Sequence, residues 1–262
     1  MKMTQIHETA VVSETADLAE NVVVGPYSII ESDVSIGSGT VIDSHVVIKG
    51  RTNIGSDNHI FSFVSIGDDP QDKKYDGEDT AVEIGNRNSI REYTTINKGT
   101  IQDVGTPRLG DDNWIMAYVH IAHDCQVGNN TIFANNTTLG GHVIVGDFVI
   151  FGGFSGAHQF CKIGAHSFLG MYSGIARDLP PYVVVMGQPA EPRGINLEGL
   201  KRRDFSSDQI RNIKTAYKKL YMSELRLEEA ISQIEKIDDI SGEIKLFIEF
   251  LKQATRGIVR KN

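Results

Sequence analysis

Apolar side chains recur at every sixth position along most of the chain. The first uninterrupted run begins at Ile6 and ends at Ile66, and each of its eleven positions carries Ile, Val or Leu. The period resumes in the same register at Ile84 and then continues, shifted by one residue, from Leu109 to Ile175. A strand repeats every two residues and a helix about every 3.6, so a strict six indicates short strands separated by corners.

Glycine often follows the repeated apolar residue, and a small or β-branched residue often stands four positions after it. Glycine suits a tight corner, and a small side chain suits a narrow interior. Hexapeptide repeats of this kind build a parallel β-helix, in which three hexads complete one coil. Residues i and i+18 are therefore predicted to lie one above the other, about 4.8 Å apart. The period does not fix the hand of the coil.

Two polar segments interrupt the period, at residues 68–83 and 102–108. The first is too highly charged for a core, and it is either a solvated excursion or an arm that reaches a ligand. We expect the repeat to stop at Asp178-Leu-Pro-Pro-Tyr182, because paired prolines interrupt a regular ladder. The prediction is a β-helix over residues 1–190, with the two loops, followed by a helical domain over residues 191–262.

Apolar residues at helical spacing replace the period of six in the last quarter of the chain. Ser206-Ser207-Asp208 offers N-cap residues for a first helix. A second helical pattern runs through Leu227, Ile231 and Ile234, and a third runs through Ile244, Phe247, Ile248 and Leu251. These helices are expected to cap the open end of the β-helix, whose last coil otherwise exposes unpaired strand edges.

Composition narrows the class of protein. The 262 residues are 40% hydrophobic and 23% charged, a balance that excludes a disordered or membrane-embedded chain. No apolar stretch approaches the length that a spanning helix needs, so we expect no integral membrane segment. A net charge of −8 argues against a nucleic-acid partner. The start of the chain lacks an apolar signal sequence, and two cysteines suit a reducing compartment, so we expect a cytoplasmic protein.

Five of the eight histidines lie in the segment from His120 to His166, and the three-hexad coil brings three of them together. The residues at multiples of 18 from His123 are Gly141 and Gln159, so these three are predicted to form one vertical row. The residues beside that row are Asp124, His142 and His158. Polar corner residues of a solenoid are often only solvated, so a functional cluster is one of two interpretations.

The functional interpretation is general-base catalysis. A neutral imidazole accepts a proton from an attacking hydroxyl or amine, while an adjacent carboxylate holds its tautomer. The backbone N–H of Gly141 is placed to face a developing oxyanion. Zinc is the competing use of clustered histidines, and the spacing of His120 and His123 would permit it. Cys125 and Cys161 lie two coils apart, too far for a disulfide, and are expected to be small interior residues.

A basic segment precedes and begins the helical domain. Between Leu200 and Leu220 there are seven Lys or Arg residues against two Asp, a local charge of +5 in an acidic chain. Basic residues on a surface helix are common. The contrast with the rest of the chain nevertheless favours a patch that attracts an acidic partner or a phosphate.

Five blocks of the sequence carry a family resemblance. They are Val119-His-Ile-Ala-His-Asp-Cys125, Asn135-Asn136, Gly141-His142, Ala157-His-Gln-Phe-Cys161 and Asn196-Leu-Glu-Gly-Leu-Lys-Arg-Arg203. Together they resemble the acyl-(acyl-carrier-protein):UDP-N-acetylglucosamine O-acyltransferases, which catalyse the first step of lipid A synthesis. The resemblance implies a left-handed parallel β-helix, a homotrimer, and an active site between subunits. It implies acyl carrier protein as the acyl donor, a UDP-sugar as the acceptor, and neither a cofactor nor a metal.

The resemblance also implies roles for individual residues. His123 matches the general base that activates the sugar 3-hydroxyl for attack on the acyl thioester, Asp124 matches its partner, and Gly141 matches the oxyanion donor. The positions that match substrate contacts are His120, His142, His158 and Gln159 around the substrates, Gln71, Asp72 and Lys74 in the first loop, and Asn196, Glu198, Arg202 and Arg203 before the helical domain. The basic segment then matches a surface for the acidic carrier protein.

Two positions depart from some family members. Met171 stands where some relatives carry glycine at the end of the acyl groove, so a bulky thioether is expected to limit the donor to a medium-length 3-hydroxyacyl chain. Asn97 replaces a histidine found in some relatives, which leaves that part of the sugar site open. The residues do not decide between a 3-hydroxyl and a 3-amino acceptor.

Three other functions remain as alternatives. The N-acyltransferases that act later in the same pathway resemble this fold but have an additional domain before the hexads, whereas here the hexads begin at Ile6. A γ-class carbonic anhydrase is a zinc lyase with the same coil. A purely structural or ice-binding β-helix ranks third among these alternatives, because such a protein should show regular threonine arrays, which this sequence lacks.

Overall fold

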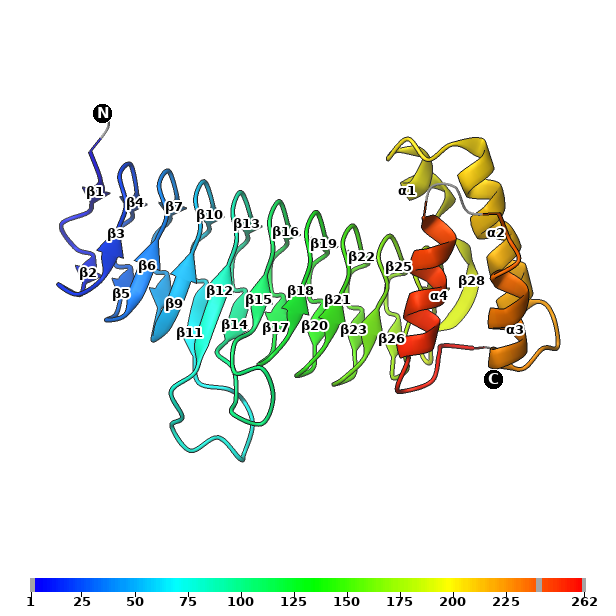
Figure 1. Ribbon diagram of the computed structural model, residues 1–262. Coiled ribbons are helices and arrows are strands. Elements are labelled where there is room, and N and C mark those ends of the chain that lie inside the picture. The colour runs from blue at the N-terminus through cyan, green and yellow to red at the C-terminus, as the bar shows by residue number, and fades with distance from the viewer. Residues whose placement is uncertain (1–2, 239–241, 261–262) are drawn as a thin grey trace.

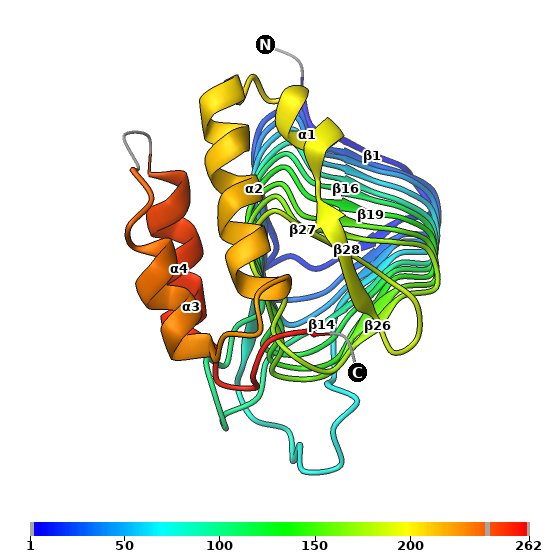
Figure 2. The ribbon, with the colours of Figure 1, turned by 90° about the vertical axis from the view of Figure 1, so that its right-hand side faces the viewer.

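Each hexad of the sequence forms one short strand, and the strands stack into three parallel sheets around a common interior (Figure 1). The computed structural model describes residues 3–238 and 242–260. Viewed along the axis, the sheets enclose a three-sided tube, and the helices lie at its C-terminal end (Figure 2). The predicted fold class, a parallel β-helix followed by a helical segment, is therefore confirmed.

The three sides of the tube are called sheets A, B and C. Sheet A contains, in spatial order, β1 (Gln5–Ile6), β4 (Val23–Val24), β7 (Val41–Ile42), β10 (His59–Ile60), β13 (Ser89–Ile90), β16 (Trp114–Ile115), β19 (Ile132–Phe133), β22 (Ile150–Phe151), β25 (Phe168–Leu169), β27 (Val183–Met186) and β28 (Glu191–Ile195). Sheet B contains β2 (Val11–Val12), β5 (Ile29–Ile30), β8 (Val47–Ile48), β11 (Ser65–Asp68), β14 (Thr95–Asn97), β17 (His120–Ile121), β20 (Thr138–Leu139), β23 (Gly156–Ala157) and β26 (Gly174–Ile175). Sheet C contains β3 (Asp17–Leu18), β6 (Val34–Ile36), β9 (Arg51–Ile54), β12 (Ala81–Ile84), β15 (Arg108–Leu109), β18 (Gln126–Val127), β21 (Ile144–Val145) and β24 (Lys162–Ile163).

The strand register confirms the coil of three hexads. Gln5 pairs with Val23, three hexads further along the chain. Across the first interruption Ser65 pairs with Thr95, and across the second Thr95 pairs with His120. The first of these pairings spans five whole hexads, so the first loop preserves the period. The second spans four hexads and one further residue, which explains why the period resumes one position later in the C-terminal half.

The repeated apolar side chain of each hexad points into the tube. From Ile30 to Phe151 these side chains are at most 4% exposed, and their burial is the main favourable term in folding. Phe133 and Phe151 stack in the interior with ring centroids 4.5 Å apart. Cys125 and Cys161 are buried and free, as the sequence predicted.

Corner residues with a left-handed backbone stack in the same way. At the corner between sheets B and C, φ is 59° at Asp124, 63° at His142 and 66° at Phe160. Few residues other than glycine adopt positive φ, and Asn, Asp and His are enriched among those that do. The coil therefore places chemically active side chains one above another at this corner.

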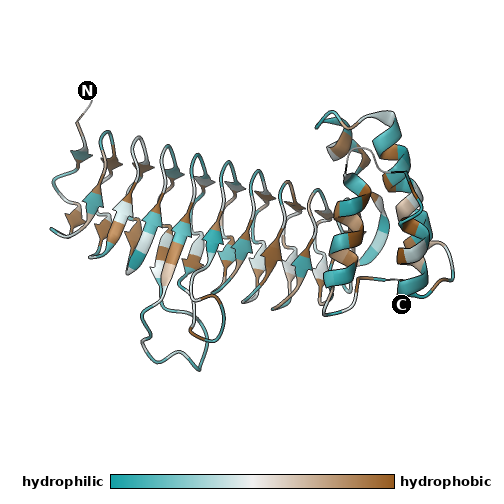
Figure 3. Ribbon diagram, viewed as in Figure 1, coloured by the Kyte–Doolittle hydropathy of each residue, from teal (hydrophilic) through white to brown (hydrophobic). Residues whose placement is uncertain are grey.

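Both interruptions leave the tube at the corner between sheets B and C. The first loop, residues 69–80, joins β11 to β12, and the second loop, residues 98–107, joins β14 to β15. They project together below the tube (Figure 1) and are largely hydrophilic (Figure 3). The predicted loops were 68–83 and 102–108. The bounds differ because Asp68 and residues 81–83 pair in the sheets, whereas residues 98–101 do not.

The sequence placed the domain boundary at residue 190. In the structure this residue lies within a hairpin, just before β28. After Pro180 and Pro181, β27 resumes parallel pairing with β25. The ladder therefore continues past the prolines, contrary to our expectation that it would stop there. The two prolines lie in the turn before β27, where no ladder hydrogen bond is required. β28 then pairs antiparallel with β27.

The C-terminal segment contains α1 (Leu197–Lys201), α2 (Ser207–Tyr221), α3 (Leu227–Ile234) and α4 (Glu243–Gln253). The last three are the helices that the sequence predicted. α2 begins at a capping box, in which the Ser206 side chain accepts the N–H of Gln209 and the Gln209 side chain accepts the N–H of Ser206. α1 was not predicted, because a helix of little more than one turn is too short to show a helical period.

Polar contacts tie the helices to the last coils. The N–H of Thr255 donates to Asp178 at 3.0 Å, the Lys162 ammonium donates to the carbonyl oxygen of Gln253 at 2.8 Å, and α2 packs on β28. The helical segment thus covers this end of the β-helix, whose strand edges would otherwise be open. Among the described residues, no helix combines the length and the apolar character needed to cross a membrane.

Candidate active site

An imidazole and a carboxylate meet at the corner between sheets B and C, in the turn that joins β17 to β18. The Nδ1 atom of His123 lies 3.0 Å from Oδ2 of Asp124. His123 is 8% exposed and Asp124 is 1% exposed. An Nδ1–H that donates to the carboxylate leaves Nε2 with a free lone pair. His123 is therefore oriented to accept a proton at Nε2.

Residues of the second loop hold the Asp124 carboxylate in place through hydrogen bonds. Its oxygens accept the N–H and the hydroxyl of Thr100, at 3.0 and 2.7 Å, and the N–H of Gly105 at 2.9 Å. A buried carboxylate needs such partners, because burial without hydrogen bonds costs several kcal/mol. The loop thus sets the rotamer of Asp124 and, through it, the orientation of His123.

Gly141 lies directly above His123, as the three-hexad coil predicted. A Cβ atom at residue 141 would lie 2.4 Å from Cε1 and 2.5 Å from Nε2 of His123, closer than atoms can approach. Only glycine leaves room for the imidazole. Within the described part of the chain, the Gly141 N–H donates to no acceptor. It is therefore available to a ligand beside His123.

His142 stands beside His123 and stacks on Phe160. The His142 and Phe160 rings are 4.3 Å apart at an interplanar angle of 3°, and the two histidine rings meet edge to face at 4.9 Å. Nδ1 of His142 lies 2.7 Å from Oδ2 of Asp103 in the second loop. The site therefore holds two imidazoles, each with its own carboxylate.

The remaining residues predicted for this site are His120, His158 and Gln159. His120 points outward from β17, with Nδ1 2.7 Å from the Thr95 hydroxyl. Burial, together with nearby His123, lowers the pKa of His120. His158 and Gln159 are exposed, and Nδ1 of His158 lies 3.2 Å from the Gln159 carbonyl oxygen.

A hollow of about 760 Å³ lies over sheet B and extends from His158 to Tyr172. Its floor is made of small residues, among them Thr138, Gly156 and Gly174. Met171, adjacent to Tyr172, is 64% exposed. A shallow, mainly apolar trough therefore runs from His158 to Tyr172, the residue next to Met171.

The first loop carries Gln71, Asp72 and Lys74, whose side chains are exposed or partly exposed. Asp72 accepts the backbone N–H of Lys74 at 3.0 Å. Buried Asn97 donates to the carbonyl oxygen of Asp69 at 2.7 Å and so fastens the start of this loop to β14. The loop reaches into solvent from the same corner as His123.

Asn196, Glu198, Arg202 and Arg203 lie elsewhere, on and beside α1 over sheet A. Asn196 caps α1 by accepting the N–H of Gly199 at 3.1 Å, and its amide donates to the carbonyl oxygen of His166 at 2.9 Å. Glu198 pairs with Lys201 at 3.3 Å, and the Arg203 guanidinium lies 4.8 Å from the centre of the Phe148 ring. These residues line a hollow of about 660 Å³ whose floor is apolar sheet A.

One chain therefore does not bring all the predicted residues together. His158 lines the hollow over sheet B, whereas the α1 residues line the hollow over sheet A. Sheets A and B, over which these hollows lie, form different sides of the tube (Figure 2).

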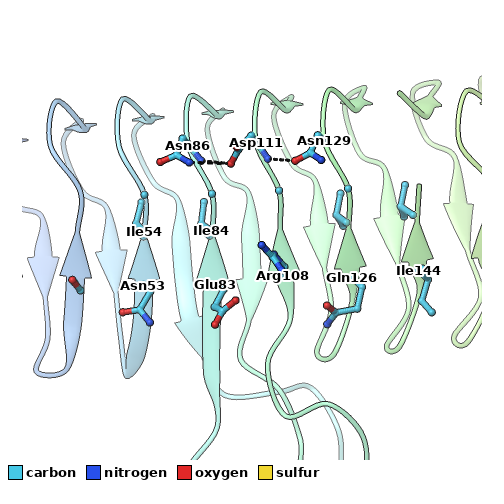
Figure 4. A pocket seen from close by; sticks show the side chains of 17 residues that line it. Asn53, Ile54, Glu83, Ile84, Asn86, Arg108, Asp111, Gln126, Asn129 and Ile144 are labelled. Atoms are coloured by element: carbon cyan, nitrogen blue, oxygen red, sulfur yellow. Dashed lines mark hydrogen bonds between the residues drawn. The ribbon is translucent and has the colours of Figure 1, made fainter. Parts of the chain in front are cut away.

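A third hollow, of about 760 Å³, lies over sheet C (Figure 4). Its floor is a row of polar side chains from successive coils, among them Glu83, Arg108 and Gln126. Along its edge, Asp111 accepts the N–H of Asn86 at 2.8 Å, as part of a ladder that joins neighbouring turns. Among the described residues, no histidine lines this hollow. The ladder stabilises the coil, and the candidate chemistry lies at the neighbouring corner.

Three groups at the corner have the identity and proximity that a metal ion requires. His123, Asp124 and His142 each offer a ligand atom, and these atoms lie within 4.8 Å of one another. The Asp124 oxygens, however, are already acceptors for Thr100 and Gly105. The hydrogen bonds present suit a proton-transfer site, in which each carboxylate orients a ring.

Sequence reasoning missed the contributions of the second loop. Thr100, Asp103 and Gly105 lie in an inserted segment, so no residue one coil away predicts their neighbours. Phe160, by contrast, follows His142 by one coil of three hexads. The stacking of these two rings was available from the spacing.

Comparisons with known proteins find relatives that match almost the whole chain. A model described as bacterial transferase hexapeptide (six repeats) matches residues 15–50 and 106–141, and one described as UDP N-acetylglucosamine O-acyltransferase, domain 2, matches residues 178–259. The acyl-(acyl-carrier-protein)–UDP-N-acetylglucosamine O-acyltransferase of Paracidovorax citrulli is 58% identical and covers 98% of this chain and 100% of that protein. The solved structure of LpxA from Acinetobacter baumannii is 48% identical, with a TM-score of 0.95 over 97% of this chain and 99% of that one.

The chain belongs to the UDP-N-acetylglucosamine O-acyltransferase family. The resemblance seen in the sequence is therefore confirmed, and the chain is an acyltransferase. Another relative of this family with a solved structure, UDP-N-acetylglucosamine acyltransferase from Francisella novicida, is 40% identical with a TM-score of 0.96, over 98% of this chain and 94% of that one. The roles of individual residues stay predictions.

We predict that His166, beneath the cap of α1, makes folding less favourable in acid. Burial and, secondarily, Arg203 lower the pKa of His166 to about 4, against about 6.5 in an unfolded chain. Above about pH 6.5 neither state binds the proton, so the effect is absent. Between about pH 6.5 and about pH 4 only the unfolded state binds it, and the free energy of unfolding falls as the pH falls.

The variant His166→Phe keeps a ring between Phe148 and Tyr182 but cannot titrate. Urea unfolding at about pH 7.5 and about pH 5 should show a smaller loss of stability in this variant than in the native chain. Equal losses in the two proteins would contradict the assignment.

Proposed function

We propose that the protein transfers a medium-length (R)-3-hydroxyacyl chain from acyl carrier protein to the 3-hydroxyl group of UDP-N-acetylglucosamine, the first step of lipid A biosynthesis. The observation that carries this proposal is the buried His123–Asp124 pair, 3.0 Å apart, with a free backbone N–H at Gly141 beside it. The family membership supplies the substrate class. We place the reaction in the cytoplasm, in keeping with the reducing compartment that the two free cysteines suit.

His123 is the proposed general base. Its Nε2 takes the proton from the sugar 3-hydroxyl as that oxygen attacks the thioester carbonyl carbon. The Asp124 carboxylate stabilises the imidazolium that forms. The Gly141 N–H donates to the carbonyl oxygen as it becomes an oxyanion. Collapse of the tetrahedral intermediate breaks the carbon–sulfur bond, and the imidazolium returns its proton to the departing thiolate of the carrier protein.

Residues around this pair hold the two substrates. His120, His142, His158 and Gln159 border the reacting groups, and Gln71, Asp72 and Lys74 in the first loop contact the UDP-sugar. Asn196, Glu198, Arg202 and Arg203 complete the nucleotide site. Because the α1 hollow faces a different side of the tube, these four residues come from a neighbouring subunit. This division supports a homotrimer, in which each site combines two chains.

The acyl chain is assigned to the hollow over sheet B. Its floor of small residues leaves room for a hydrocarbon chain, and it ends near exposed Met171. A methionine side chain at that point limits the length of the chain. The carrier protein, which is acidic, is assigned to the basic face of α2, where Lys214 and Lys218 are exposed.

The deciding experiment incubates the purified protein with UDP-N-acetylglucosamine and a set of 3-hydroxyacyl carrier proteins of graded chain length. Mass spectrometry should detect an O-acylated UDP-sugar from a medium-length donor. A parallel reaction with a 3-amino UDP-sugar tests the alternative acceptor, because one base serves either nucleophile. Transfer to the amine alone would refute the proposed acceptor. Metal analysis and a carbon dioxide hydration assay on the same protein test the zinc lyase.

His123→Ala should lower acyl transfer at least about 100-fold, because the general base is lost. The matched control is His59→Ala, since His59 also pairs with a carboxylate, Asp43 at 3.2 Å, but lies on sheet A away from the cluster. Sedimentation should show the same oligomer for both variants. Turnover of His123→Ala close to that of the control would remove His123 from the mechanism.

Met171→Gly should shift the donor preference to longer acyl chains, because it removes the side chain that ends the hollow. The measurement is the ratio of kcat/KM for long and medium donors. Met222→Gly, which also removes an exposed methionine but lies at the end of α2, is the control. An unchanged ratio in Met171→Gly would eliminate the length limit at this position.

A subunit-mixing experiment tests the shared site. His123→Ala and Arg202→Ala chains should each be weakly active alone. Co-refolded in equal amounts, they should regain about one quarter of native activity, because random assembly joins two intact halves at that frequency. No recovery in mixed trimers would mean that one chain supplies both groups.

A further inference from the structure

A second imidazole–carboxylate pair lies beside the one assigned to catalysis. Nδ1 of His142 is 2.7 Å from Oδ2 of Asp103, shorter than the His123–Asp124 separation of 3.0 Å. The same nitrogen is 3.9 Å from Oδ2 of Asp124, too far for a hydrogen bond. Asp103 is therefore the carboxylate that pairs with His142.

We propose that Asp103 is a positioning residue that acts through His142. Its carboxylate accepts the Nδ1–H, so the ring takes the tautomer in which Nε2 carries a free lone pair. Nε2 lies on the opposite side of the ring from Nδ1 and so points away from the loop, toward the substrates. There it accepts a hydrogen bond from a hydroxyl of the acceptor sugar. This inference rests on the proposed function.

The surroundings of His142 leave Asp103 as the group that decides this orientation. The imidazole side chain is 8% exposed and is held flat against Phe160 by stacking, which fixes the plane of the ring but permits a flip that exchanges its two nitrogens. The titratable groups that face it are Asp103, Asp124 and His123. Only a short hydrogen bond to one nitrogen distinguishes the two flipped states.

The second loop does not depend on Asp103 for its own position. Thr100 and Gly105, on either side of Asp103, are held by the buried Asp124 through three hydrogen bonds of 2.7 to 3.0 Å. The Asp103 side chain itself is 43% exposed. Removing its carboxylate should therefore release His142 and leave the loop in place.

The first test measures the tautomer without any substrate. Nitrogen NMR of the native protein labelled at histidine should show His142 with its proton on Nδ1. In Asp103→Ala the two tautomers should mix, and in Asp103→Glu the Nδ1–H form should persist. An unchanged His142 signal in Asp103→Ala would overturn the proposal, whatever reaction the enzyme catalyses.

The second test measures acyl transfer. Asp103→Ala should raise KM for the acceptor about tenfold and change kcat less. A tenfold change is near the low end of the effect expected for losing a hydrogen bond to a charged group, because Asp103 is partly exposed. Asp103→Glu should restore most of the loss. Gln102→Ala, an exposed neighbour in the same loop, controls for general loop effects and should match the native enzyme.

A double-mutant cycle separates positioning from structure. In a His142→Ala background, Asp103→Ala should cause no further loss, because the residue through which it acts is absent. Equal effects of Asp103→Ala with and without His142 would assign it to loop structure and overturn the proposal. If native protein transfers no acyl group, the proposed function fails, and the NMR result still decides the role of Asp103.

Discussion

Parallel hydrogen bonding between successive coils of three hexads is the constraint on which the whole molecule depends. The strands are so short that no single one is stable alone. Stability comes from stacking every coil on the next, with one buried apolar residue in each hexad from Ile30 to Phe151. The same stacking aligns corners as well as strands. A tube built in this way therefore holds a column of side chains in fixed order along each of its edges.

The corner between sheets B and C shows how such a column becomes a site. Its left-handed backbone positions favour Asp, Asn and His, which are also residues able to transfer protons or bind polar ligands. Asp124 and His142 occupy successive positions there, and Gly141 leaves the space that the His123 ring fills. The requirement of the fold for particular corner residues and the requirement of the chemistry for titratable ones thus coincide at the same positions.

Insertions at this corner supply hydrogen-bonding groups that the regular repeat does not place there. A regular coil places neighbours only at intervals of one coil, so groups that lie off this spacing must come from inserted residues. The second loop supplies such groups, since Thr100 and Gly105 donate to Asp124 while Asp103 pairs with His142. The length of the loop is not restricted to whole hexads, because its excess residue is absorbed by a shift in register.

The sequence by itself determined the repeat, the interior residues, the last three helices and the vertical row of His123 and Gly141, because the stacking of coils converts spacing into proximity. It did not determine that β27 continues the ladder beyond Pro180 and Pro181, that residues 197–201 form a helix, or that Asp103 reaches His142. These features depend on turns, short segments and an inserted loop, whose neighbours no period specifies. The tertiary structure also decided that the α1 residues and the histidines face different sides of the tube, because that separation depends on how the chain returns over sheet A after its last coil.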